Sequence, residues 1–416
     1  MDNETRTRIP ISADWVLKRI QEGKDVRLKN AVIKGDLDLR KLNLTQLKDG
    51  PHVLVTSSIE IRNTIFDGSV NFRKAIFEKL IILDRNQFND IIDISFSQFN
   101  EIAHFTKSLF NGEALFLGSH FGRFVYFDES QFSGISEFGA SHFGADVHFT
   151  RTRFFKGVIF NGSRFEGKAF FLASKFDDDT FFDDITFNDY AEFSRCLFGG
   201  YIEFKKSSFC RDASFAASKF SDRANFESAS FSGRLILNSS EIHSMNLDAR
   251  FDEGSSISLK HSEYYRLEAN WANIKDKIEY DGSAYLALVK NYNRLEWFSD
   301  ADNCYYQYRK RRRSSLKIKE KMVDIIPWMV YGYGVRPEIP ILWLTLLFLF
   351  SACVYSYGGQ TQTFLNASEL SIVFLTTTTQ IGSLAGFHRW WSISERVLGW
   401  LLMSTFLVTL AKKMLK

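Results

Sequence analysis

The sequence predicts a β-solenoid with short helical caps, followed by an all-α membrane domain with two spans. Three observations support this fold class. Phenylalanine recurs every eleven residues through the first half of the chain. No proline lies between Pro51 and Pro327. Two long uncharged apolar runs lie near the C-terminus. The first two observations indicate a long regular β structure, and the third indicates membrane segments.

Two series of large apolar residues carry the eleven-residue spacing. In the first, Phe occupies all sixteen multiples of eleven from Phe66 to Phe231. The second lies six residues later, from Phe72 to Leu237, and thirteen of its sixteen members are Phe. Alternating steps of six and five fit neither the 3.6-residue helical period nor the two-residue period of a flat strand. They fit a 22-residue coil of four faces, each of which sends one large residue inward.

The residue two positions before each large one also faces inward, because side chains alternate along an extended face. These residues are small, as expected where the interior already holds large rings. Examples are Ser119, Ser130, Ser141, Thr152, Ser163, Ser174, Cys196, Ala114, Ala169, Ala191, Ala213 and Ala224. Glycine is expected at the bends, for example Gly112 and Gly134. Weaker members of the two series extend the predicted solenoid over residues 31–245, roughly nine or ten coils stacked about 4.8 Å apart.

This pattern resembles the pentapeptide-repeat family, which implies a right-handed quadrilateral β-helix. Some members of that family are acidic and mimic DNA, but residues 61–240 hold 20 basic and 23 acidic side chains. We therefore expect a scaffold or binding surface, and no nucleic-acid partner. His120 and His142 are expected to stack outside on successive coils. A solvated ladder is favoured there over a metal site, so no metal site is predicted.

Helical caps are predicted on both sides of the solenoid. Residues 1–30 form the N-terminal cap, with a helix over 11–23 that has Ser12 as N-cap and Gly23 as its end. Residues 246–315 form a cap and linker with two helices between 283 and 315, similar to a single tetratricopeptide-type unit. Such caps cover an open β edge. A dedicated partner-binding site is the alternative role for the second cap.

A basic amphipathic helix with an elbow is predicted over residues 316–338. Its apolar face holds Ile318, Met322, Ile325, Ile326 and Met329. The eight basic residues that lie before and within it are Arg309, Lys310, Arg311, Arg312, Arg313, Lys317, Lys319 and Lys321. A nucleic-acid arm is one interpretation of such a run. The apolar face and Trp328 favour a membrane surface instead.

Residues 339–416 predict two membrane spans. The first covers Ile339 to Tyr357, which are uncharged, and the second covers 392–412, with Glu395 and Arg396 near the outer interface. Basic residues precede the first span, and Lys412 and Lys413 follow the second. The chain is therefore expected to be a multi-pass protein of the cell membrane with both termini in the cytoplasm.

A short helix is predicted between the spans, over residues 366–379. Asn366 as N-cap and Glu369 three residues later make a capping-box pattern. Its apolar part is too short to cross a bilayer, which favours a re-entrant pore helix. The C-terminal partial negative charge of this helix would then favour a cation.

The order of span, pore helix and span resembles the two-span pore domain of the potassium-channel superfamily, whose filter sequence is T-x-G-Y-G-D. The resemblance implies a filter over residues 378–383. The six residues in the order of that motif are Thr378, Thr379, Gln380, Ile381, Gly382 and Ser383. Only Thr378 and Gly382 match the conserved letters. Gln380 replaces a glycine whose freedom to adopt positive φ matters for a ring of carbonyls. Gly399 is either a gating hinge or a site of close helix packing.

The leading hypothesis is a homo-oligomeric cation channel, a tetramer by resemblance, with a cytosolic solenoid. The altered filter predicts weak K⁺ selectivity or non-selective Na⁺ and K⁺ conduction. Ca²⁺ is the weaker alternative, because the filter holds no acidic residue. The second hypothesis is a membrane-anchored scaffold with a non-conducting pore. No enzyme is expected, since no nucleophile–base arrangement, phosphate-binding glycine loop or metal motif is found. The expected partners are the bilayer and further copies of the chain, with permeant cations and no cofactor.

Overall fold

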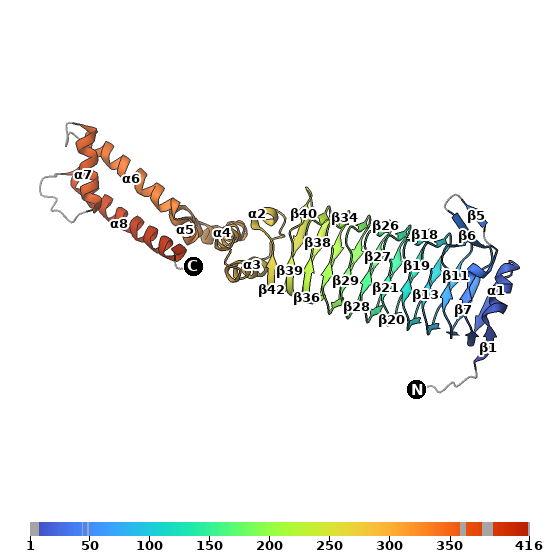
Figure 1. The fold of residues 1–416 in the computed structure, drawn as a ribbon. Helices are drawn as coiled ribbons and strands as arrows, with labels where there is room; N and C mark the ends of the chain where they lie inside the picture. The colour runs from blue at the N-terminus through green and yellow to red at the C-terminus, as the bar shows by residue number, and fades with distance from the viewer. Residues whose placement is uncertain (1–7, 44, 48–49, 358–362, 377–385, 415–416) are drawn as a thin grey trace. The chain divides into compact units, whose positions relative to one another are not determined.

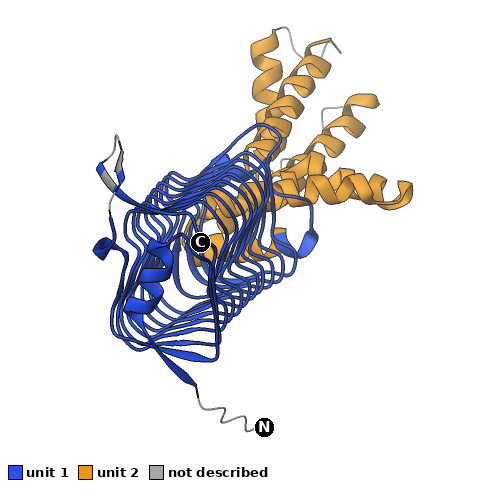
Figure 2. Cartoon of the chain, turned by 90° about the vertical axis from the view of Figure 1, so that its right-hand side faces the viewer, with its two compact units in different colours: residues 1–284 blue, residues 285–416 orange. Residues whose placement is uncertain are grey.

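The computed structural model describes residues 8–43, 45–47, 50–357, 363–376 and 386–414 (Figure 1). The chain divides into two compact units, residues 1–284 and 285–416 (Figure 2). The first unit is a parallel β-solenoid, and the second is helical. The predicted succession of solenoid and all-α region is therefore confirmed.

The solenoid has four strand columns. One is a parallel sheet that runs from β2 (Val26–Lys29) through β7 (Ile59–Arg62) to β41 (Ser256–Ser258). A second runs from β6 (Gly50–Val55) to β40 (Arg250–Phe251) and is joined at one edge by the antiparallel β5 (Thr45–Leu47). The other two columns begin at β1 (Ile9–Ser12) and β4 (Leu37–Asp38). They join in the long strands β36 (Lys219–Asn225), β39 (Glu241–Asn246) and β42 (Glu263–Glu268).

The strand register confirms the 22-residue coil. Phe88 of β12 (Gln87–Phe88) pairs with Phe110 of β16 (Leu109–Phe110). On another face, Ile81 of β11 (Ile81–Ile82) pairs with Ala103 of β15 (Ala103–His104). Each residue therefore lies directly above the residue one coil earlier, which explains why large side chains recur at fixed intervals.

The large residues form continuous stacks of rings inside the coil. The members of both phenylalanine series are buried from Phe66 to Leu237. Phe110 and Phe132 stack with centroids 4.4 Å apart and planes 3° apart. Rings on neighbouring faces meet edge to face, as Phe116 and Phe127 do at 5.3 Å and 89°. Both geometries are favourable for aromatic pairs, so the spacing in the sequence produces a regular aromatic core.

The small inward residues add a ladder of hydrogen bonds that the sequence pattern did not reveal. The Ser141 hydroxyl donates to the carbonyl of Phe116 at 2.7 Å and accepts from the amide of Ser119 at 3.2 Å. The donated bond recurs at Ser97, Ser108, Ser119, Ser130, Thr152, Ser163 and Ser218. Each hydroxyl thus adds a buried hydrogen bond to backbone groups of the preceding coil, which links successive coils through their side chains as well as through strand pairing.

The glycines expected at the bends are not the residues with left-handed backbone. The left-handed bend residues recur every eleven positions and include Ala140 (φ 52°) and Arg151 (φ 57°), with glycine only at Gly118 and Gly162 in the described part of this series. Gly134 does not have a positive φ. A Cβ added to Gly134 would lie 2.4 Å from the carbonyl oxygen of Gly112. Glycine is thus needed there because two coils approach closely, whereas its freedom to adopt positive φ is not required.

Strands continue beyond residue 245, where the sequence analysis placed the end of the solenoid. The pairing of β36 with β39 shifts between Phe220 and Arg223. Later inward residues therefore fall out of the eleven-residue spacing, although Leu247, Ile257 and Leu259 are still buried.

At the N-terminal end of the solenoid, α1 (Ala13–Gln21) follows β1, and the Ser12 hydroxyl accepts from the Trp15 amide at 3.2 Å. Ser12 is therefore the N-cap, as predicted.

An outward carboxyl predicts a pH-dependent stability of the solenoid. Burial, with a smaller contribution from Glu203, raises the pKa of Asp183 from 3.8 to about 6. Because this pKa is higher in the folded state, protonation of Asp183 favours folding. This contribution to stability is fully present below pH 3.8 and is lost as the pH rises through about 6. Asp183→Asn should therefore stabilise the protein above pH 6 and have little effect in acid. Asparagine fits, because Asn161 one coil earlier accepts the equivalent bond from the Asp183 amide at 2.9 Å.

Thermal unfolding of wild type and Asp183→Asn, at about pH 4 and about pH 8, measures this effect. The melting temperature of the variant should exceed that of wild type at the higher pH only. An equal difference at both values would show that the ionised carboxylate is not the cause.

The second unit is built from helices. They are α3 (Gly282–Arg294, which begins in the first unit), α4 (Phe298–Ser315), α5 (Ile318–Tyr331), α6 (Glu338–Tyr357), α7 (Phe364–Thr376) and α8 (Phe387–Met414). A short α2 (Trp271–Ile274) precedes them, and a 3₁₀ turn at Gly332–Gly334 follows α5. By length and composition, α6 and α8 can each cross a membrane. The two predicted spans are thus present as helices, and α7 lies between them in the chain.

Candidate pore domain

Helices α6, α7 and α8 meet around a small apolar cluster. Tyr355 from α6 and Ala367 and Phe374 from α7 are buried in it, with Leu370 and Trp391 packed against them. The rings of Tyr355 and Phe374 lie 5.8 Å apart. The short helix α7 is therefore held by contacts with the helices on both sides of it in the chain.

The start of α7 differs from the prediction. The helix begins at Phe364, and the Asn366 amide donates to the Thr363 hydroxyl at 3.3 Å. Asn366 is therefore inside the helix and is not its N-cap. Threonine is also a capping residue, so the capping-box pattern placed the N-cap three residues too late. With 13 residues α7 is about 20 Å long, shorter than the roughly 30 Å of a bilayer core.

The predicted filter residues Thr378, Thr379, Gln380, Ile381, Gly382 and Ser383 lie outside the described residues. The described chain stops at Thr376, the end of α7, and resumes at Gly386, just before α8. The filter assignment thus stays a prediction. The second span is longer than the predicted 392–412, because α8 begins at Phe387.

Gly399 lies where α8 packs against α7. A Cβ at Gly399 would lie 2.4 Å from Cδ2 of Leu375. This close approach is the one expected if Gly399 serves close helix packing. Its alternative role as a gating hinge stays a prediction.

Glu395 is the feature that sequence reasoning missed. Its side chain is fully buried between helices, while its predicted depth near the outer interface stays a prediction. The Tyr355 hydroxyl on α6 donates to its Oε2 at 2.6 Å, and the Ser371 hydroxyl on α7 donates to its Oε1 at 2.5 Å. One carboxyl thus joins three helices. The sequence showed only that the Glu395 carboxylate lies four residues before Gly399. Its partners Tyr355 and Ser371 are too distant in sequence to be found from a local pattern.

The basic belt, defined as the eight basic residues from Arg309 to Lys321, divides into two groups. Lys310, Arg312, Lys317, Lys319 and Lys321 are exposed. The other three arginines lie over aromatic rings: Arg309 over Tyr333, Arg311 over Tyr285 and Arg313 over Trp328, at 4.5, 5.8 and 4.2 Å. The exposed group can meet an anionic surface. Arg309 and Arg313 stack on rings of the elbow, whereas Arg311 ties α4 to α3.

The ion pair between Arg309 and Asp324 holds the elbow together. Their closest atoms lie 2.6 Å apart, and Tyr333 donates to the second oxygen of Asp324 at 2.5 Å. Burial raises the pKa of Asp324, but the hydrogen bonds from Tyr333 and Arg309 outweigh it and leave the pKa below its usual value. Arg309 is therefore used within the protein and is not available to lipid.

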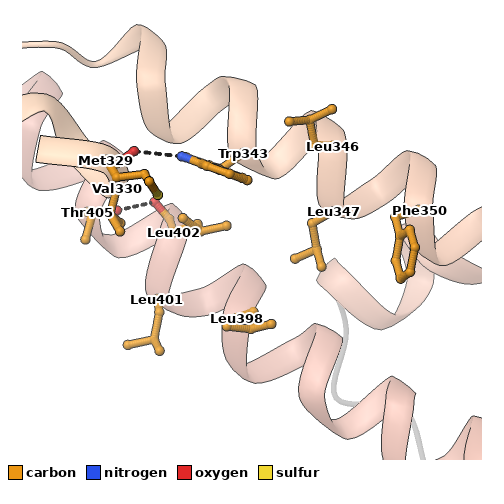
Figure 3. A pocket seen from close by; sticks show the side chains of 10 residues that line it. All are labelled: Met329, Val330, Trp343, Leu346, Leu347, Phe350, Leu398, Leu401, Leu402 and Thr405. Atoms are coloured by element: carbon orange, nitrogen blue, oxygen red, sulfur yellow. Dashed lines mark hydrogen bonds between the residues drawn. The ribbon is translucent and has the colours of Figure 1, made fainter. Parts of the chain in front are cut away.

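An apolar groove lies between α6, α8 and the end of α5 (Figure 3). It has a volume of about 820 Å³. Met329, Val330, Trp343, Leu346, Leu347, Phe350, Leu398, Leu401, Leu402 and Thr405 line it. The Trp343 indole donates to the carbonyl of Met329 at 2.7 Å and so ties α6 to α5 at one end of the groove. Outside the groove, the apolar face of α5 is also uncovered, with Ile318 83% and Met322 65% exposed.

The solenoid surface carries a pair of stacked histidines. His120 and His142 lie on successive coils with ring centroids 4.7 Å apart, as expected for a ladder. Burial, with the neighbouring His142, lowers the pKa of His120. Within the described residues, no group of three or more His, Cys, Asp or Glu side chains is placed to hold a metal ion.

No protein-family model matches the chain, and neither a curated protein nor a solved structure matches it.

Proposed function

We propose that the chain is the subunit of a homo-oligomeric cation channel of the cell membrane, with a cytosolic pentapeptide-repeat domain. One observation carries the proposal. A short apolar helix, α7, packs against two helices that are each long enough to cross a bilayer. It is followed by the uncharged segment 377–385, which contains Thr378 and Gly382.

The re-entrant placement of α7 follows from its length. A helix of about 20 Å cannot span a bilayer core of about 30 Å. Backbone that ends inside the bilayer must be buried in protein or line water. The C-terminus of α7 carries a partial negative charge that favours a cation in front of it. In this proposal α7 dips into the membrane and presents residues 378–383 to the permeating ion.

Self-association completes the pore. Two spans cannot surround a channel, and the groove between α6 and α8 is uncovered in the single chain. In the proposed assembly, a tetramer by resemblance to the potassium-channel superfamily, neighbouring copies cover this apolar surface. By resemblance to the pentapeptide-repeat family, the solenoid is a right-handed quadrilateral β-helix. It serves as an assembly or gating module in this proposal.

The basic belt supports the orientation. Its five exposed members lie before the first span, and Lys412 and Lys413 lie in the last turn of the second. Basic residues near the ends of spans favour the cytoplasmic side, and each contributes about 1 kcal/mol when it lies close to an anionic lipid surface. In this proposal both termini, and with them the solenoid, lie in the cytoplasm.

The filter sequence leads to an electrophysiological test. Wild-type protein in planar bilayers, with K⁺ on one side and Na⁺ on the other, should show a reversal potential close to zero. Gln380→Gly should move it towards strong K⁺ selectivity, because glycine restores the backbone freedom of a carbonyl cage. The same exchange at Gln360, which precedes α7, is the matched control and should leave the reversal potential unchanged.

Three results would count against this account. Strong K⁺ selectivity of the wild type would contradict the weak filter. An equal shift with Gln360→Gly would remove the link to residues 378–383. Absence of current would support the non-conducting membrane scaffold instead.

A further inference from the structure

The buried carboxyl of Glu395 has an unusual position for a charged side chain. It lies in α8, a helix apolar enough to cross a membrane, and none of its surface is exposed. Ionisable residues inside membrane segments are costly and mark functional positions. Both oxygens of Glu395 are hydrogen-bonded, one to Tyr355 of α6 and one to Ser371 of α7. The site is thus built around the carboxyl, and its partners come from two other helices.

A second polar contact lies beside the first. Trp391, one turn before Glu395, donates its indole N–H to the Ser351 hydroxyl on α6 at 3.1 Å. Ser351 is one turn before Tyr355 and is also fully buried. The Trp391 ring packs edge to face on Phe350 at 5.2 Å. The helices α6 and α8 are therefore joined by a further polar contact beside the one that Glu395 makes with Tyr355.

What Glu395 adds is a connection to α7. Its contact with Ser371 is followed one turn later by the close approach of Gly399 to Leu375. Two successive turns of α8 thus face two successive turns of α7. Ser371 is five residues before Thr376, the end of α7, after which the predicted filter segment begins. A shift or rotation of α7 at Ser371 would move the start of that segment.

Simple helix adhesion does not require a carboxyl. Serine and threonine hydroxyls are sufficient to join membrane helices, and each such bond has only a small effect. A buried carboxyl is far more expensive, but it accepts two hydroxyls at fixed angles and so selects one arrangement. The geometry therefore favours precise positioning over simple adhesion.

We propose that Glu395 is a positioning residue of the pore, which acts through Ser371 and Tyr355 to fix α7 and hence the ion-selecting segment that follows it. This inference rests on the proposed channel function. It assigns a role in ion selection to a side chain outside the filter itself.

Single-channel recording of the full-length protein in planar bilayers tests the proposal, with K⁺ and Na⁺ on opposite sides. Glu395→Gln should change the Na⁺/K⁺ permeability ratio by at least about threefold, the factor corresponding to one interhelical hydrogen bond in a membrane. Ser371→Ala should change the ratio in the same direction. If Glu395→Gln does not yield folded protein, Ser371→Ala decides the matter alone.

Matched controls separate positioning from a general loss of stability. Glu369→Gln removes an exposed carboxylate from α7, and Tyr357→Phe removes a hydroxyl from the 97% exposed tyrosine of α6. Both should behave as wild type. The double variant Tyr355→Phe with Glu395→Gln should change the ratio by less than the sum of the two single changes, because both substitutions act on the same contact.

The failure of this inference differs from the failure of the channel proposal. If wild type and controls conduct, but Glu395→Gln and Ser371→Ala alter only the number of active channels, Glu395 is a structural residue and the inference is wrong. If wild type gives no current, both proposals fall together.

Discussion

Replacing Phe149 by alanine should lower the free energy of unfolding of the solenoid by about 3–5 kcal/mol. Its ring is fully buried and stacks between Phe127 and Phe171, at 4.8 and 5.0 Å. It also meets Phe138 edge to face at 5.4 Å. The coils above and below are fixed by strand pairing, so the interior cannot collapse around the cavity, and the loss should be near the upper end of the range.

Urea unfolding of the full-length protein in detergent, followed by circular dichroism, measures this change. Phe124→Ala is the control, because Phe124 belongs to the same solenoid but is 39% exposed. The control should shift the midpoint much less than Phe149→Ala does. Equal shifts would mean that the ring stack is not the main source of stability.

Gly399→Leu should disrupt the packing of α7 and abolish the proposed current. A Cβ would lie 2.4 Å from Cδ2 of Leu375, so even a small side chain requires the Leu375 side chain to move, and a complete leucine side chain must displace it further. Overfilling a packed site costs about 1–3 kcal/mol, and here the strain falls one turn after the contact between Glu395 and Ser371. Both effects act on the helix that precedes the predicted filter.

Thermal stability in detergent and current in planar bilayers report this effect together. Ser404→Leu places the same side chain on an exposed position of α8 and should be close to wild type in both assays. A Gly399→Leu protein with normal stability and current would show that α7 and α8 do not need to be in contact.

The repeating part of the fold was predictable from the sequence because its physics is local. Each coil repeats the same contacts, so one spacing of large residues was enough to predict the 22-residue register that pairs Phe88 with Phe110. The serine ladder was not foreseen, because a small residue at that position satisfies the packing requirement whether or not it carries a hydroxyl. Strands beyond residue 245 were missed since the shift between Phe220 and Arg223 ends the spacing without ending the pairing.

The candidate site was less predictable because its contacts are not local. Hydropathy and length identified the helices that became α6 and α8. Glu395, however, depends on Tyr355 and Ser371, which lie 40 and 24 residues away. A charge in an apolar helix can lie at an interface or be buried with partners. Only the three-dimensional arrangement distinguishes these cases.

The central claim is that the protein conducts cations, and a salt gradient tests it most directly. Purified wild-type protein in a planar bilayer is held between KCl solutions of about tenfold different activity, for which a purely cation-selective current reverses at about 59 mV. We predict a reversal potential close to this value, with the sign expected when K⁺ and not Cl⁻ carries the current. A reversal potential near zero or of opposite sign, or no current above that of a protein-free bilayer, would contradict the account.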